Sequence, residues 1–244
     1  MDLPAPDSVA WLTAEDLVRE GFRRSRVVMM NEAHNGERRC IRTRTVGRRI
    51  LPAAWETGAR VLLMEALGPP AGPPAGTESP YLGQPEMALF IDAARQLGFT
   101  LGGYEAEIDR APVELLRDTT AMPFTNWRER RQAENLIAQV NAAPATAGVL
   151  VWSGNSHLRR TPLADWSPMG WWYERLGATP GFVIDQTITV NFGEAGNALA
   201  QVLLDKYGEV LTTRGGEVGV VLDERLRAGV GADAVLLSSD NRLE

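Results

Sequence analysis

The chain has 244 residues, 44% hydrophobic and 23% charged, a balance typical of a folded globular protein rather than a disordered or fibrous one. Acidic residues outnumber basic ones, 31 against 25, and the net charge of −6 disfavours nucleic acid as a partner. Cys40 is the only cysteine, which excludes an internal disulfide framework and favours a reducing compartment. The first residues lack a signal-peptide profile and no apolar run reaches the roughly 18 residues of a membrane span, so we expect a cytoplasmic protein without a membrane partner.

Short apolar runs alternate along the chain with segments of helical periodicity. The runs predict strands at 26–30, 60–64, 99–104, 148–152, 181–185 and 233–237. The periodic segments predict helices at about 13–21, 39–57, 85–97, 127–142, 168–176 and 195–206. This alternation is typical of parallel βα units. The predicted fold class is therefore α/β: a single domain over 1–244, with a central, mostly parallel β-sheet flanked by helices.

Three stretches depart from this alternation or have an unusual composition. The Pro- and Gly-rich segment 68–80 predicts a loop, either over the site or as a plain surface linker. The segment 208–231 has no clean periodicity and suggests a hairpin leading into the last strand. The arginine-rich segment 37–49 favours a solvated helix face over an anion-binding patch, because the whole chain is acidic.

Polar residues of catalytic type follow four predicted strands. Glu32 and His34 follow the first, Glu65 the second, Glu105 the third and His157 the fourth. The chain has only two histidines, and both fall in this pattern. Because the carboxyl ends of parallel strands meet at one sheet edge, we expect these side chains to line one cleft.

The chemistry of these residues predicts acid–base catalysis. Glu32 lies two residues from His34 and can orient and activate it as a general base. Glu65 follows a buried-type run, so its carboxylate requires a cation, a histidine or a metal as a partner. The cation can come from one of three arginines of the next helix, and spacing does not select among them: Arg128, Arg130 and Arg131.

A second set of residues is predicted to bind substrate. Gly154 permits a tight turn after the fourth strand, and Asn155 and Ser156 are expected to donate hydrogen bonds to a developing oxyanion. The sequence offers His157 only these two near polar neighbours, which predicts a secondary role in proton transfer. Glu105 and Trp152 complete the predicted substrate-binding set.

Four motifs in one order resemble a known superfamily. Asn31-Glu32-Ala33-His34 is similar to a Gly-Glu-x-His motif, with Asn31 in place of glycine, and Glu65 ends a Leu-Leu-Met-Glu run. Residues 128–135 are similar to an Arg-Asp-x-x-Met-Ala-x-Asn helix motif, and Gly154-Asn155-Ser156-His157 matches Gly-x-x-His. Over about residues 25–160 the chain resembles the erythromycin esterase-like proteins and their wider relatives, the ChaN-like and Tiki/TraB-like proteins.

The resemblance implies a pocket of histidines, glutamates and an arginine that serves ester or lactone hydrolysis through a His-activated water, metal-dependent peptide cleavage, or haem binding. We expect a metal-independent hydrolase of a small-molecule ester or lactone, with elimination or cyclisation in secondary metabolism as related acid–base chemistry. The predicted catalytic residues are Glu32, His34, Glu65, Arg128 and His157. The alternatives are a ChaN-like haem- or metal-binding protein and a Tiki-like metal-dependent peptidase. No cofactor or metal ligand is predicted, and the sequence specifies neither substrate nor oligomeric state.

Overall fold

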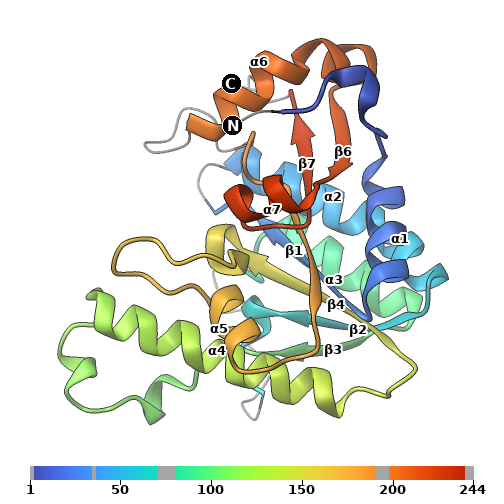
Figure 1. Ribbon diagram of the computed structural model, residues 1–244. Helices are drawn as coiled ribbons and strands as arrows, with labels where there is room; N and C mark the ends of the chain where they lie inside the picture. Colours follow the sequence, from blue (N-terminus) through green and yellow to red (C-terminus); the bar gives the residue numbers. More distant parts are fainter. Residues whose placement is uncertain (1–2, 35–36, 71–80, 191–197, 240–244) are drawn as a thin grey trace.

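The computed structural model describes residues 3–34, 37–70, 81–190 and 198–239, and in them a seven-stranded sheet runs through the centre of the molecule (Figure 1). Its strand order is β3-β2-β4-β1-β5-β7-β6, and every pairing is parallel except that of β6 with β7. The strands are β1 (Val27–Glu32), β2 (Ala59–Met64), β3 (Thr100–Gly103), β4 (Gly148–Gly154), β5 (Gly181–Asp185), β6 (Glu217–Val221) and β7 (Ala234–Ser238). The predicted α/β fold class is confirmed.

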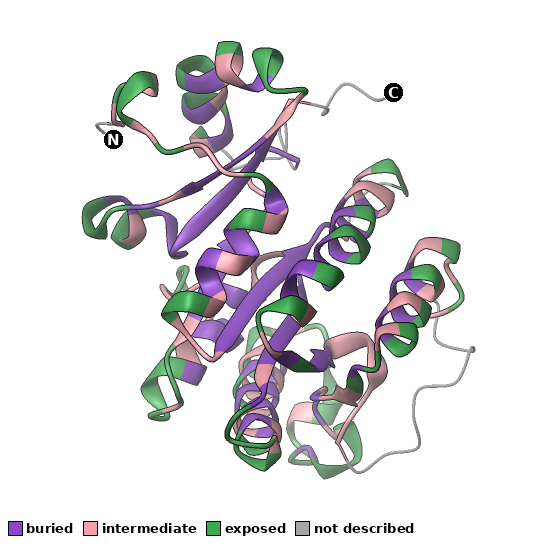
Figure 2. Ribbon diagram, turned by 90° about the vertical axis from the view of Figure 1, so that its right-hand side faces the viewer, coloured by how far each residue is buried: buried purple, intermediate pink, exposed green. Residues whose placement is uncertain are grey.

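Helices cover both faces of this sheet, which explains why its strands read as apolar runs. In β1, Val28 and Met30 pack with residues of α1, α2 and α3, whereas Val27 and Met29 pack with residues of α4 and α6. Figure 2 shows the result: a buried central sheet inside helices whose outer faces are exposed. The helices are α1 (Ala14–Arg24), α2 (Glu37–Glu56), α3 (Pro85–Leu97), α4 (Met122–Ala142), α5 (Met169–Arg175), α6 (Ala198–Thr213) and α7 (Glu224–Val230).

The predicted elements up to residue 206 overlap the observed ones. Helix α3 has the predicted bounds, because Pro85 suits its first turn and Gly98 ends it in the left-handed conformation at φ 92°. Helix α4 begins five residues before the predicted start, and α2 begins two residues before it. The loop predicted at 68–80 lies outside the described residues from 71 onward. No helix in the described residues is long and apolar enough to cross a membrane.

The segment 208–231 is not a hairpin, so that expectation is wrong. It contains the end of α6, strand β6 and helix α7, and β6 pairs with β7 across the intervening helix. Asp223 caps α7 by accepting a hydrogen bond from Leu226 N at 2.8 Å, and Gly231 ends the helix at φ 79°. A seven-residue helix spans only two turns, too short for a clear periodicity.

The parallel register brings the sequence motifs to one edge of the sheet. Glu32 lies opposite Gly154 where β1 pairs with β4, and Met64, just before Glu65, lies opposite Trp152 where β2 pairs with β4. Two short 3₁₀ helices continue these strands: η2 (Glu65–Leu67) follows β2 and η5 (Asn155–Leu158) follows β4. The carboxyl ends of three adjacent strands therefore enclose a common space.

Candidate active site

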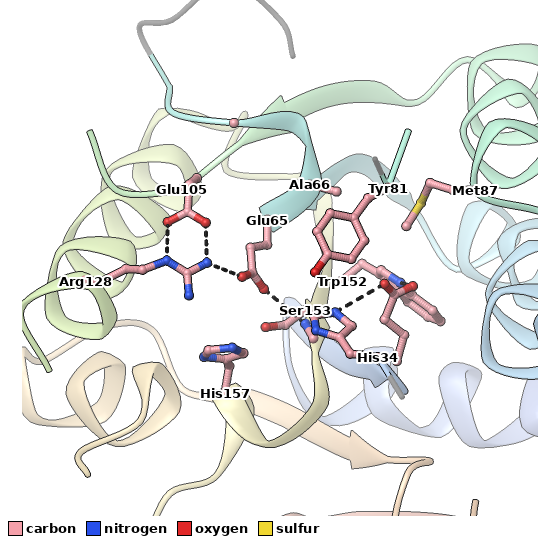
Figure 3. Close-up of a pocket in the computed structure, with 13 residues that line it drawn as sticks. His34, Glu65, Ala66, Tyr81, Met87, Glu105, Arg128, Trp152, Ser153 and His157 are labelled. Carbon is pink, nitrogen blue, oxygen red and sulfur yellow. Dashed lines mark hydrogen bonds and ion pairs between the residues drawn. The ribbon is translucent and has the colours of Figure 1, made fainter. Parts of the chain in front are cut away.

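A pocket of about 320 Å³ opens at this edge of the sheet, between β1, β2, β4 and helix α4 (Figure 3). The structure brings all five residues predicted as catalytic to the walls of this one pocket: Glu32, His34, Glu65, Arg128 and His157. Glu65 lies between the two imidazoles in the close-up view. The expectation of a single shared cleft is confirmed.

Glu32 is a buried carboxylate held by three donors. Arg44 of α2 donates from Nε at 2.9 Å and from Nη2 at 3.0 Å, one bond to each carboxylate oxygen, and the indole of Trp152 donates at 2.8 Å. Burial alone would raise the pKa of Glu32, but the contacts with His34, Arg44 and Trp152 outweigh it and lower the pKa. Glu32 therefore stays charged and fixed in position next to His34.

His34 reaches the pocket at the end of β1 with a quarter of its side chain exposed. Its Nε2 lies 3.5 Å from a carboxylate oxygen of Glu32, so the carboxylate favours a hydrogen on that nitrogen and leaves Nδ1 to accept a proton. One side of the ring lies against Gly154, where a Cβ would come within 2.0 Å of the ring. The ring of Tyr81 lies at a centroid distance of 5.4 Å.

Arg128 joins two carboxylates of the pocket. Its Nη2 contacts Oε1 of Glu65 at 2.6 Å, and Nε donates to Glu105 at 3.0 Å within a two-pronged contact. The second oxygen of Glu65 accepts a hydrogen bond from the backbone N–H of Gly154 at 3.1 Å. Although burial opposes it, the charges of His157 and Arg128 lower the pKa of Glu65 to about 2. Nη1 of Arg128 points into the pocket in Figure 3 and carries no dashed contact there.

His157 has its own buried carboxylate. Its Nδ1 lies 2.6 Å from Oε1 of Glu129, a fully buried residue of α4, in an ion-pair contact without hydrogen-bond geometry. Trp166 and the backbone N–H of Met169 donate to the same carboxylate. Burial would lower the pKa of His157, but Glu65 and Glu129 outweigh it and raise the pKa to about 9. At neutral pH His157 is therefore a cation and a potential acid.

The predicted substrate-binding residues divide into two groups. Glu105 and Trp152 line the pocket, whereas Asn155 and Ser156 are not among its lining residues. The reason is the turn that opens η5: Asn155 has φ 33°, and its carbonyl accepts a hydrogen bond from Asn31. Ser153 lines the pocket in their place.

The structure also shows which arginine faces the pocket. Arg128 does, whereas Arg130 pairs with Glu134, and Arg131 pairs with Glu107 and Glu134. On a helix, Arg130 points about 200° away from Arg128, whereas Arg131 lies on a neighbouring part of the same face and is held by Glu107 instead.

Three residues of the site escaped sequence reasoning. Arg44 is 1% exposed, so the prediction of a solvated arginine face is wrong for this residue. Glu129 is adjacent to Arg128 in the chain but faces His157, and the signal for it was a carboxylate inside the arginine motif. Tyr81 lines the pocket directly after a Pro- and Gly-rich segment, where the sequence carried no signal for a binding residue.

The donor atoms of the pocket are engaged within the protein and do not fit a divalent metal. The two oxygens of Glu32 already accept hydrogen bonds from Arg44, those of Glu65 are engaged by Arg128 and Gly154, and Nδ1 of His157 lies 2.6 Å from a carboxylate oxygen of Glu129. In the described part of the chain, no three His, Cys, Asp or Glu side chains form a group that could hold a metal ion. The imidazoles lie among carboxylates, an arginine and the ring of Tyr81.

Comparison with known proteins gives only distant similarities. No family model and no curated protein matches the chain. RRSP, a MARTX toxin effector domain from Vibrio vulnificus CMCP6, is 12% identical over 71% of this chain and 36% of its own, with a TM-score of 0.48. The type III effector HopBA1 is 13% identical over 93% of this chain and 95% of its own, with a TM-score of 0.49.

These similarities carry no argument about function. The chain spans just over a third of the length of the toxin chain that contains RRSP, and both TM-scores are below 0.5. Neither structure is described as erythromycin esterase-like, ChaN-like or Tiki-like. The resemblance to that superfamily, and the assignment of residues 1–244 to one of its domains, stay predictions.

Proposed function

We propose that the protein is an enzyme that hydrolyses an ester or lactone bond of a small molecule by general acid–base catalysis, without a metal. The observation that carries this proposal is that two histidines line one pocket and each contacts its own buried glutamate, His34 with Glu32 and His157 with Glu129. Under this proposal the chain is a distant member of the erythromycin esterase-like superfamily.

The two histidines suit opposite halves of the reaction. His34 accepts a proton from water through Nδ1, and the resulting hydroxide attacks the carbonyl carbon. Protonated His157 and Nη1 of Arg128 stabilise the negative charge that develops on the carbonyl oxygen. His157 then gives its proton to the leaving alkoxide, and transfer of a proton from His34 back to His157 through solvent restores the starting state.

The surrounding carboxylates keep His157 protonated. Glu129 and Glu65 hold the pKa of His157 near 9, which retains its proton until a basic alkoxide leaves. Arg128 and the backbone of Gly154 keep Glu65 ionised, so Glu65 stabilises positive charge and does not compete as an acid. A base and an acid on opposite sides of one carboxylate also suit elimination or cyclisation, which stays within the proposal as related chemistry.

The test is hydrolysis of p-nitrophenyl acetate, p-nitrophenyl butyrate and a set of γ- and δ-lactones at pH 7.5. We expect turnover of at least one compound by the native protein and loss of roughly 10²–10⁴-fold in rate in His34→Gln. The matched control is Gln201→Ala in α6, an exposed position away from the pocket, which should leave the rate unchanged. Equal rates for native protein and the double variant His34→Gln/His157→Gln would contradict the proposal.

A further inference from the structure

Asn31 connects three segments that meet beside the pocket. It is 1% exposed near the end of β1, and its Nδ2 donates to the backbone oxygen of Asn155 at 2.8 Å. The same nitrogen contacts Asp185 Oδ1 at 2.9 Å and Thr187 Oγ1 at 3.1 Å. Its Oδ1 accepts a hydrogen bond from the backbone N–H of Gln186 at 2.9 Å. Both polar atoms of this buried side chain are therefore in use.

The contact with Asn155 lies at a backbone conformation that is costly without support. Asn155 has φ 33°, one of two positive values among the described non-glycine residues. A residue other than glycine is strained in the left-handed conformation, asparagine less so than most. Asn155 is also the first residue of η5, the short helix that carries His157 two positions later.

The position of η5 determines what surrounds His157. Glu129 and Arg128 face the imidazole from α4, Glu65 faces it from η2, and the ring of Trp166 lies at a centroid distance of 5.9 Å. A small movement of the turn would change the distance from His157 to each of these groups together.

We propose that Asn31 is a positioning residue, whose amide holds the left-handed turn at Asn155 and thereby sets the imidazole of His157 against Glu129. The hydrogen bonds of Asn31 are the evidence that it positions His157. The effect of this positioning on turnover rests on the proposed function. Glycine, the usual residue of the similar motif, has no side chain to make this bond. The contact therefore distinguishes this chain from the pattern that it resembles.

The experiment follows the two histidines by NMR in the full-length protein, where two imidazole signals are expected because the chain has two histidines. In Asn31→Ala we expect the midpoint of the His157 titration to fall from about 9 toward the ordinary value of about 6.5. The control is Leu237→Ala in β7, which leaves a buried cavity away from the pocket and should lower stability without moving the midpoint.

A second substitution tests whether Asn31 affects His157 through the turn at Asn155. Adding Asn155→Gly to Asn31→Ala should restore the midpoint, since glycine adopts the left-handed conformation without support. If Asn31→Ala does not fold, Asn31→Ser replaces it in the same comparison. A midpoint that stays at about 9 in the Asn31 variant, or that falls equally in Leu237→Ala, overturns the proposal. Absence of ester hydrolysis in the native protein would contradict only the proposed function, because the titration needs no substrate.

Discussion

The imidazole of His34 lies against the α-carbon of Gly154, so closely that a Cβ at position 154 would come within 2.0 Å of the Cε1 atom. This contact joins the ends of two adjacent strands, β1 and β4, at the residue expected to act as the base. Gly154 has no positive φ, so its role is to leave space for the ring.

Gly154→Ala should therefore displace His34 without unfolding the protein. We expect roughly a 10²-fold or larger loss of esterase activity, because a base displaced by about 1 Å no longer aligns with its water. The His34 NMR signal should move while the His157 signal moves less. Gly208→Ala is the matched control, because a Cβ there meets nothing within 4 Å and the residue lies in α6. Normal activity in Gly154→Ala would show that the ring can shift without consequence.

Stability should depend on pH through His157. Its pKa is raised from 6.5 to about 9 on folding, so the stabilisation is complete below pH 6.5 and is lost as pH rises from 6.5 through 9. The size of this contribution is about 3 kcal/mol. Urea unfolding of native protein and His157→Gln at pH 6 and pH 9.5 measures it. Between pH 6 and pH 9.5 the free energy of unfolding should fall further in native protein than in His157→Gln. An equal fall in both proteins would refute the raised pKa of His157.

Glu65 should show the opposite dependence on the acid side. Its pKa is lowered from 4.5 to about 2, so its stabilising contribution is present above pH 4.5 and is lost as pH falls toward 2. In Glu65→Gln this part of the acid destabilisation should disappear. Glu209→Gln, which changes an exposed carboxyl on α6, should retain the native acid profile. Equal acid profiles for native protein and Glu65→Gln would contradict the assigned pKa.

Glu129→Gln should lower the protonated fraction of His157 at pH 8, although Glu65 stays in place. Removing the adjacent charge lowers the pKa of His157, and the rate should fall most for esters with poor leaving groups, which need protonation. Glu134→Gln, on the same helix but paired with Arg130 and Arg131 at the surface, should have little effect. The measurement is the ratio of rates for an alkyl ester and a p-nitrophenyl ester. An unchanged ratio would exclude His157 as the acid.

Substitution of His34 and of His157 should reduce activity on different sets of substrates. The sequence predicted His34 as the more important residue, on the premise that His157 had only Asn155 and Ser156 nearby, and the contact with Glu129 overturns that premise. We now expect His34→Gln to reduce kcat for all esters, and His157→Gln to reduce it mainly for alkyl esters. If His34→Gln keeps near-normal kcat while His157→Gln is inactive, the assignment of the base is reversed.

Much of the fold was predictable because each buried strand is a short run of apolar residues. The run 26–30 and the polar residues after it, for example, predicted both β1 and the side chains at its end. The shared pocket followed from parallel pairing, which places the ends of neighbouring strands side by side. The prediction of a hairpin at 208–231 was wrong because helix α7 is too short to show a helical hydrophobic period.

The partners of the site residues were less predictable, because they depend on how each helix is rotated about its axis. Arg44 resembles the other arginines of its segment in sequence, and only the packing of α2 buries it against Glu32. Glu129 and Arg128 are neighbours in the chain but contact different groups of the pocket, His157 and Glu105. Tyr81 reaches the pocket through the path of the chain before α3, which local sequence does not encode.

The place of β4 between β2 and β1 has a consequence for biosynthesis. Both neighbours leave the ribosome before β4, so until residues 148–154 emerge each has an unpaired, apolar edge that only β4 satisfies. The pocket and the link between β1 and β2 are thus completed by the same event. A nascent chain halted before Gly148 would have exposed strand edges prone to association and no binding site, so partial products of translation would be substrates for chaperones rather than weak enzymes.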